Sequence, residues 1–429
     1  MFRAVIRKFL TSAMLLVVGL VALEREAGAI PTFARKYRTS CSTCHVAIPM
    51  RNAFGEAFRR NGYQIPAGDE RYIKEEPVSL GAEAWKEMWP EAIWPGAIPE
   101  SVPFSAYAHQ RFVWDNPKDD REFDAPHELE LLMGNTLGRN VAFFGEFVFF
   151  EKGQNVPGLK RLFLQFSNLF EGKLGRALSI RVGRFEPGIA DGYKDADRLT
   201  MEHPITLDYR VTNAFRIRDA QSGLEIAGVP HRSFEYVFGV VNGQGVTVND
   251  PNNSRDVYFR AGVKFRGMGL DGSGSPEGDE LPMADNYVDD SVTLGFYGYR
   301  GLSTQTEGGV TFDNRFRRMG VDARLNYGRN YLRAGLVQGR DENPYNTSQR
   351  DVDSTAWFVE VDRVFKPWIL GALRYEKLRI DGKSDLTQLV PNLTLLARAN
   401  IRVSLEAFIQ PSLDADPFRT FKANVLFAF

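Results

Sequence analysis

Two cysteines and a histidine stand together near the start of the chain, in the stretch TSCSTCHVAIP from Thr39 to Pro49. Cys41 and Cys44 are the only cysteines among 429 residues, and His45 directly follows the second. This CxxCH spacing is the attachment pattern of c-type haem. Two thiols three positions apart reach the two vinyl groups of one porphyrin, and the adjacent imidazole binds the iron. We therefore expect one covalent haem c, with Cys41 and Cys44 as thioether residues and His45 as proximal ligand.

Two other uses of the cysteines fit less well. A disulfide would resemble thioredoxin-like CxxC pairs, but no βαβ pattern surrounds the motif, and the following His would have no role. Structural zinc would need a second pair of ligands at the usual spacing, and none follows. The haem interpretation accounts for all three residues.

The residues after the motif predict a short helix. MRNAFGEAFRRNGY, from Met50 to Tyr63, places Phe54 and Phe58 on one side and ends with the helix-stopping Gly62. These two rings would cover an apolar face of the macrocycle, or they would serve ordinary helix packing.

A sixth ligand for the iron is less well defined. Met88 suits a His/Met site, and Met50 and His109 are alternatives. The segment 30–103 is short for an independent core, so we expect the haem or a larger surrounding structure to stabilise it.

The first 29 residues read as a secretory signal. A positive start, with Arg3, Arg7 and Lys8, precedes an apolar core and the small residues at 27–29. The apolar stretch has roughly half the residues (about 20) that a membrane-spanning helix needs, so export is favoured over anchoring.

From about Phe104 the hydrophobic period changes to two, in segments such as SFEYVFGVV, DVYFRAGVKF and AWFVEVDRVF. Alternation predicts strands, although a soluble sandwich and a membrane barrel share it. Short turns that alternate with long polar connections, the export signal, and a last strand ending on Phe429 with one apolar face favour the barrel. We predict an all-β fold, a transmembrane antiparallel β-barrel of about 16 strands with a small N-terminal α-helical haem c plug domain.

The alternating segments can be counted. Sixteen strands are predicted, with starts near residues 104, 126, 140, 158, 176, 219, 231, 254, 290, 315, 330, 352, 368, 386, 400 and 417. The predicted parts are 1–29 (signal peptide), 30–103 (monohaem plug domain) and 104–429 (outer-membrane barrel). A lumen of that size holds water or a plug.

The predicted turns assign loops to the two sides of the barrel. The tight turns fall on one side, taken as periplasmic: 137–140, 229–232, 327–330, 365–368 and 398–400. The acidic segment 271–290 falls there too, so we interpret it as a hydrated loop, or as a docking patch for a basic periplasmic carrier. Long connections occupy the other side: 114–125, 188–212 and 340–353. They carry the outer-face acids Asp115, Asp119, Asp120, Glu122, Asp124, Asp191, Asp195 and Asp197.

Overall charge excludes one class of partner. The formal net charge is −1 with 25% charged residues, so no basic field argues for nucleic acid. Aromatic residues make up 12% of a chain whose mean hydropathy is −0.29, as expected when apolar and polar residues alternate.

The stretch IPTFARKYRTSCSTCHVAIPMRNAFGEAFRRNGY resembles the N-terminal region of the outer-membrane porin–cytochrome c fusion family, the monohaem c-type cytochromes with a C-terminal β-barrel found in iron-oxidising bacteria. The similarity is most specific from Pro31 to Gln64, where Pro-x-Phe-Ala precedes the motif and Phe-Gly-x-x-Phe and Asn-Gly-Tyr follow it. Over the remainder it rests on architecture. The resemblance implies a barrel embedded in the lipid of the bacterial outer membrane, with a haem domain on the periplasmic side or in the lumen. It also implies extracellular Fe(II) as electron donor.

Three functions remain open at this stage. The first is electron transfer between an extracellular donor and periplasmic carriers such as c-type cytochromes, with Fe(II) oxidation as its leading form. The second is a porin or channel whose haem domain is a structural or gating plug. The third is a peroxidase-like haem enzyme, for which no distal acid–base residues stand out. Several charged residues are predicted to face the lumen. An ion path could follow them, but charged lumen faces are normal in barrels, so none is singled out: Glu128, Glu130, Arg181, Glu360, Asp362, Arg374, Glu376, Arg402 and Glu406.

Overall fold

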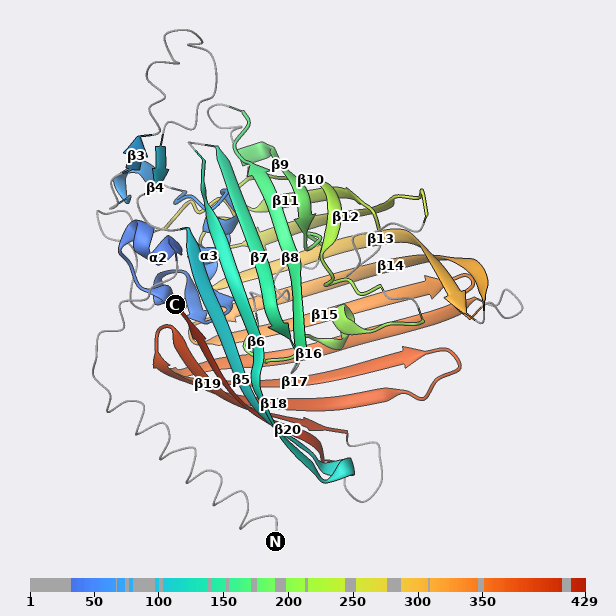
Figure 1. The fold of residues 1–429 in the computed structure, drawn as a ribbon. Coiled ribbons are helices and arrows are strands. Elements are labelled where there is room, and N and C mark those ends of the chain that lie inside the picture. Colours follow the sequence, from blue (N-terminus) through green and yellow to red (C-terminus); the bar gives the residue numbers. More distant parts are fainter. Residues whose placement is uncertain are drawn as a thin grey trace.

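The computed structural model of this chain describes residues 32–66, 68–73, 77–79, 97–99, 103–137, 140–151, 154–170, 176–189, 198–212, 215–243, 252–275, 287–307, 309–345, 351–410 and 418–429. These residues form a closed barrel of sixteen strands with a small helical part at its N-terminal end (Figure 1). The predicted fold class is confirmed. The predicted signal segment and Met88 lie outside the described residues.

The barrel strands follow the chain order around the ring, and each pairs antiparallel with its neighbours. Their bounds are β5 (Phe104–Asp115), β6 (Asp120–Thr136), β7 (Val141–Glu151), β8 (Gln154–Phe166), β9 (Ser179–Phe185), β10 (Gln221–His231), β11 (Phe234–Val241), β12 (Asp256–Phe265), β13 (Ser291–Glu307), β14 (Val310–Tyr327), β15 (Asn330–Asp341), β16 (Val352–Lys366), β17 (Ile369–Ile380), β18 (Leu386–Arg398), β19 (Ile401–Ile409) and β20 (Phe418–Ala428).

The remaining elements are short. They are α2 (Thr32–Tyr37), η1 (Cys41–Thr43), β1 (His45–Ala47), β2 (Met50–Arg51), α3 (Ala53–Arg60), η2 (Asp69–Arg71), β3 (Pro77–Ser79), β4 (Ala97–Pro99), η3 (Asn116–Lys118) and α5 (Ile205–Asp208). We call the described part from Thr32 to Ile73 the plug. No helix in the described part of the chain is long and apolar enough to cross a membrane.

The first and last strands close the barrel. β20 pairs with β5, so that Leu426 stands opposite His109, and the backbones of Ala106 and Phe429 exchange two hydrogen bonds of 2.6 and 2.9 Å. All sixteen predicted strands are present. The largest error in a predicted start is at β6, which begins at Asp120 rather than near 126.

The two faces of the barrel wall differ in the sense expected of a lipid-embedded barrel. Along β14, Arg318 and Asp322 point inward and are buried, whereas Met319, Val321 and Leu325 point outward and are 40–46% exposed. A soluble protein would bury these apolar side chains and expose the charges. The alternation therefore gives an apolar exterior around a charged lumen.

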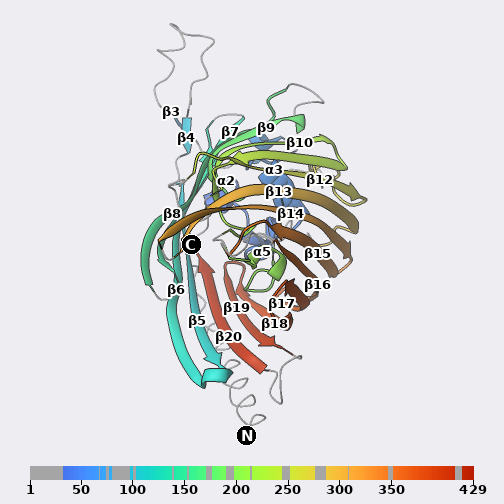
Figure 2. The same ribbon diagram turned by 90° about the vertical axis from the view of Figure 1, so that its right-hand side faces the viewer.

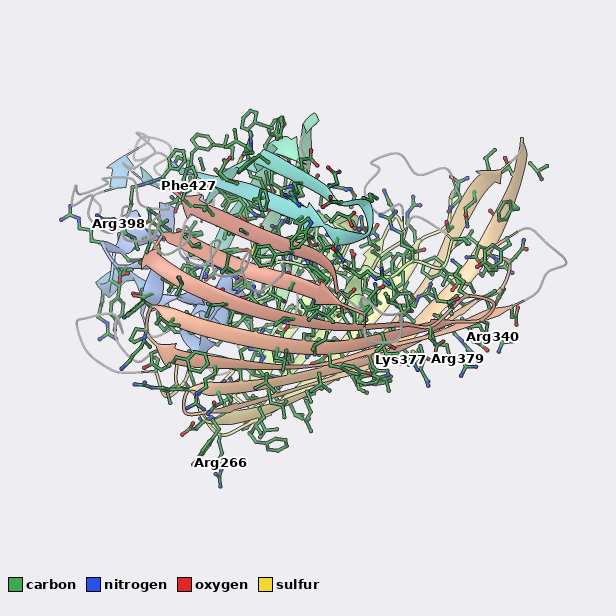
Figure 3. All side chains as sticks on the ribbon, turned by 90° about the horizontal axis from the view of Figure 1, so that it is seen from below. Arg266, Arg340, Lys377, Arg379, Arg398 and Phe427 are labelled. Atoms are coloured by element: carbon green, nitrogen blue, oxygen red, sulfur yellow. The ribbon has the colours of Figure 1, made fainter. Side chains whose placement is uncertain are left out.

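The tight turns gather at one end of the barrel, which we call the turn end. They join β6 to β7, β10 to β11, β14 to β15, β16 to β17 and β18 to β19, as predicted. Figure 3 shows Arg398 and Phe427 at this end, beside the blue plug, and Arg340, Lys377 and Arg379 at the opposite end. The acidic segment 271–290 joins β12 to β13 and so also belongs to the turn end; its residues 276–286 lie outside the described ones.

One predicted connection is wrong. Residues 114–125 were expected to form a long loop, but β5 continues to Asp115, β6 begins at Asp120, and only the short η3 lies between them. Of the predicted outer-face acids, Asp119, Asp120 and Glu122 are exposed there. The other acidic group of the opposite face lies outside the described residues: Asp191, Asp195 and Asp197.

The plug sits in the turn end of the barrel and contacts several strands. Thr32 N donates to Ser105 Oγ (2.8 Å) at the start of β5, and Arg60 Nε donates to Glu235 Oε2 (2.9 Å) on β11. Arg402 on β19 donates to the carbonyl of Ile48 (2.8 Å). Contacts from three sides of the ring fix the plug in the lumen, and Figure 2 shows α2 and α3 within the outline of the strands.

The segment between β9 and β10 also folds inward. Its α5 lies within the ring of strands in Figure 2. Leu207 and Tyr209 are buried among aromatic side chains of the barrel wall that include Tyr258, Tyr299 and Phe358. The predicted long polar connection at 188–212 therefore fills the lumen over its described residues, 188–189 and 198–212.

Candidate functional site

The cysteine motif is held in a tight turn between α2 and α3. Ser40 caps η1 by accepting a hydrogen bond from Ser42 N (3.3 Å), and Cys44 N donates to Cys41 O (3.2 Å). Both thiols are free. Burial raises the pKa of the Cys44 thiol to about 12 and also raises the pKa of the Cys41 thiol.

Helix α3 packs directly against the motif. Asn52 caps the helix by accepting from Gly55 N (2.8 Å), while its amide nitrogen donates to Thr43 O (3.0 Å). A Cβ on Gly55 would stand 2.2 Å from the carbonyl oxygen of Cys44, so glycine alone permits this approach. The predicted helix is confirmed, although α3 is shorter than the segment 50–63 on which it was predicted.

The imidazole of His45 is oriented for metal binding. Its Nδ1 lies 3.1 Å from the carbonyl oxygen of Pro49, which accepts only, so Nδ1 carries the proton and Nε2 keeps its lone pair. Burial lowers the pKa of His45 to about 4, with a further contribution from Arg51. The neutral ring is the form that binds metals, and a carbonyl on Nδ1 is a common orienting partner.

Aromatic side chains surround the motif. Phe33 stacks on Tyr63 at 5.4 Å between ring centroids and meets Phe58 edge to face at 5.3 Å. Phe54 and Phe58 are 4% and 6% exposed and belong to the small core of the plug, together with Tyr37. They exclude water on one side of the motif.

The motif and its aromatic neighbours line one cavity of about 440 Å³ between the plug and the barrel wall. Cys41, Cys44 and His45 line it from the plug, as do Phe54 and Phe58. The opposing surface comes from β5 to β8 and from the inward-folded segment around Met201. Cofactor sites are of this size and combine apolar walls with a few polar groups.

Charged side chains complete the lining of this cavity. Among the described residues, eight bases line it: Arg51, Arg59, Arg111, Lys160, Arg161, Arg181, Arg198 and Arg218. Six acids line it: Glu128, Glu130, Glu146, Glu151, Glu186 and Glu202. The excess of two bases suits a ligand that carries two carboxylates, which is the charge of a haem's propionates.

The described residues therefore fit the haem c that the motif predicts. Two thiols, a neutral imidazole oriented through Nδ1, aromatic walls and surplus positive charge meet in one cavity. No cluster of three or more His, Cys, Asp or Glu able to hold a bare metal ion occurs in the described part of the chain.

The candidates for a sixth ligand have different positions. Met50 is 1% exposed and packs in another core with Leu199 and Tyr331, and it does not line the cavity. His109 lines the cavity from β5. Sequence reasoning missed His127 on β6, which also lines it and meets His109 edge to face at 4.8 Å.

Comparison with known proteins found solved structures whose fold is similar to this barrel. The fold is similar to the anion-selective porin of Comamonas acidovorans (TM-score 0.53, 13% identity, 77% of this chain and 99% of that chain covered) and to OmpF of Salmonella typhi in complex with daunomycin (0.52, 13%, 76% and 97%). It is also similar to a loop-deletion form of OmpT, an outer membrane protein of Vibrio cholerae (0.51, 12%, 77% and 99%). At these identities the likeness shows a porin fold. No family model and no curated protein matches the chain.

Proposed function

We propose that this protein is an outer-membrane barrel that holds one covalent haem c between plug and wall and passes electrons between an extracellular donor and a periplasmic carrier. The observation that carries the proposal is the shared cavity: the thiols of Cys41 and Cys44 and the imidazole of His45 line one space between the plug and the wall of a porin-like barrel. A porin alone has no use for that set of side chains.

The chain's own residues would hold the cofactor. Cys41 and Cys44 supply the thioether sulfurs, and His45 supplies Nε2 to the iron, oriented by the carbonyl of Pro49. Phe54 and Phe58 cover an apolar face and exclude water. When bound, haem c supplies one-electron redox chemistry tuned by its ligands and its burial.

The position of the plug supports exchange with a carrier on the periplasmic side. Short turns of outer-membrane barrels face the periplasm, so the turn end and the plug face that side. A periplasmic carrier, such as a c-type cytochrome, would take electrons there. The wall presents an apolar exterior to the lipid, which insulates the two sides from each other.

The donor follows from the resemblance of the N-terminal stretch. We propose extracellular Fe(II) as the substrate: each Fe(II) ion gives up one electron and leaves as Fe(III), and the periplasmic carrier accepts that electron. The exposed acids Asp119, Asp120 and Glu122 lie at the far end of the barrel, where a cation would arrive.

The test uses the full chain, produced with a haem-attachment system and purified in detergent. We expect a haem stain that survives denaturation and that is lost when both cysteines are changed, Cys41→Ala with Cys44→Ala. Ser42→Ala, within the same turn, is the control and should stain. Anaerobic Fe(II) should reduce the wild-type chromophore. An unstained wild-type protein would refute the proposal.

A second function has its own support. One of the solved structures that the barrel resembles is described as an anion-selective porin, which favours a channel in which the plug is structural or gating. Liposome swelling separates the two functions. A channel admits small solutes whether or not the cysteines are present, whereas an electron-transfer protein with a filled lumen shows Fe(II)-dependent reduction without swelling.

A further inference from the structure

The cavity contains a second imidazole arranged like that of His45. His127 lies on β6 and is 8% exposed, and its Nδ1 is hydrogen-bonded to the carboxylate of Asp124. A carboxylate accepts, so Nδ1 carries the proton and the lone pair stays on Nε2. Within the described structure, Nε2 of His127 has no hydrogen-bond partner. A carboxylate on the far nitrogen is the arrangement that orients metal-binding histidines and raises their basicity.

The other ligating side chains around the cavity are committed elsewhere. His203 Nε2 lies 3.2 Å from Arg198 Nη1, a group that only donates, so its lone pair is used. His109 Nε2 lies 2.9 Å from Asn424 Oδ1 and carries the proton, which leaves only the more hindered Nδ1.

The methionines are less suitable. Met133 lies beside Gly145, where an added Cβ would be 3.0 Å from its sulfur, and Gly145 alternates with the lumen-facing Glu146. Met133 is one of the residues that line the cavity, but this contact places its sulfur toward the outer side of the wall. Met201 also lines the cavity, on the inward-folded segment, where its N–H donates to Glu406 (2.7 Å) and its carbonyl accepts from Arg198 (2.9 Å); no carbonyl or carboxylate of the described residues orients its sulfur as Asp124 orients His127.

We infer that His127, from the barrel wall, would supply its Nε2 as a second protein ligand to the haem that His45 of the plug would bind, and that Asp124 is its positioning residue. This inference rests on the proposed function. Two histidine ligands would join plug to barrel through the cofactor and would leave the iron no position for a peroxidase-like reaction.

The test measures the spin state and reduction potential of the haem iron rather than the electron-transfer activity. The oxidised wild-type protein should give the low-spin absorption and paramagnetic resonance spectra of two axial imidazoles. His127→Ala should convert the spectrum to high-spin, and added imidazole should restore the low-spin form. His127→Met should stay low-spin with a raised reduction potential, because a thioether favours the ferrous state.

Two further variants test whether the effect belongs to His127. His109→Phe preserves the ring contact with His127 and should leave the spectrum low-spin. Asp124→Asn should also stay low-spin but shift the potential upward, since the imidazole loses its charged partner. A low-spin spectrum unchanged in His127→Ala, or a high-spin wild type, would overturn the inference. Each still shows bound haem, whereas absence of any covalent haem refutes the proposed function itself.

Discussion

The two sides of the lumen use the same residue types in different ways. On the side of β12 to β19, which we call the packed side, charges pair across neighbouring strands with no space between them. Arg318 lies 2.8 Å from Asp341, and Arg374 lies 3.2 Å from Glu360 and 2.9 Å from Glu376. On the side of β5 to β9, the cavity side, charges surround the space that the cysteine motif faces.

The difference separates structural charges from site charges. Of the charges predicted to face the lumen, only Glu128, Glu130 and Arg181 lie on the cavity. The others are buried on the packed side: Glu360, Asp362, Arg374, Glu376, Arg402 and Glu406. These six side chains are buried against their partners and the inward-folded segment, so they are charges of a filled lumen.

Breaking the packed side should have the largest effect. Arg374→Leu leaves Glu360 and Glu376 as buried carboxylates without their cation, so we expect the free energy of unfolding to fall by about 3–5 kcal/mol. Urea unfolding of the barrel in lipid vesicles measures this. Adding Glu360→Gln and Glu376→Gln should recover much of the loss, and a change below about 1 kcal/mol in Arg374→Leu would contradict the picture of paired buried charges.

On the outer surface of the wall, the same substitution should cost the same on the cavity side and on the packed side. Leu159 on the cavity side and Leu336 on the packed side are 41% and 37% exposed, as expected for lipid contact. Arginine at either position should cost about 2–4 kcal/mol if it lies near the middle of the membrane. The same unfolding measurement tests both variants. Tyr327→Arg at the rim is the control, with an expected cost of about 0–1 kcal/mol; equal costs at all three positions would argue against a lipid-facing wall.

Loss of the cap of α3 should lower stability only in the plug. Asn52→Ala removes the cap of α3 and the hydrogen bond to Thr43, with an expected cost of about 0.5–2 kcal/mol. Because the barrel does not depend on that cap, amide hydrogen exchange should speed up in α3 and in the motif but stay unchanged in β14. Faster exchange throughout the barrel would show that plug and wall unfold as one unit.

The charges around the cavity should matter least for stability. Lys160 lies 2.8 Å from Glu146, 2.9 Å from Glu130 and 3.5 Å from Glu128, but its side chain is 30% exposed. We expect Lys160→Met to cost about 1 kcal/mol at most, as for partly solvated pairs. Urea unfolding beside Arg374→Leu gives the comparison directly, and a loss as large as that of Arg374→Leu would remove the distinction between the two sides.

Most of the barrel could be predicted because lipid and lumen impose opposite demands on alternate residues. That signal fails where both faces meet water. The far end of the β5–β6 hairpin, around Asp120 and Glu122, extends as strand without an apolar face, and the sequence there resembles a loop. Its exposed residues, with Phe123 at 81%, are consistent with such a protruding end.

The site was only partly predictable for a related reason. Cys41, Cys44 and His45 form a local pattern, and Phe54 and Phe58 follow from one helix. His127 stands 82 positions beyond His45 along the chain, and only strand pairing brings it to the cavity. Gly55 and Asn52 had a weak signal in the Phe-Gly-x-x-Phe stretch, but their contacts with Cys44 and Thr43 needed coordinates.

Under the proposed function, the inward position of Cys41 and Cys44 implies an order of events in biogenesis. The ring closes through contacts such as that between His109 and Asn424, which are 315 positions apart, so it cannot be completed before the last strand is in place. Both thiols face the barrel wall across the cavity once the plug is seated. Attachment of the proposed haem would therefore come before the plug enters the turn end, and a plug that enters too early would hide its thiols from the attachment machinery.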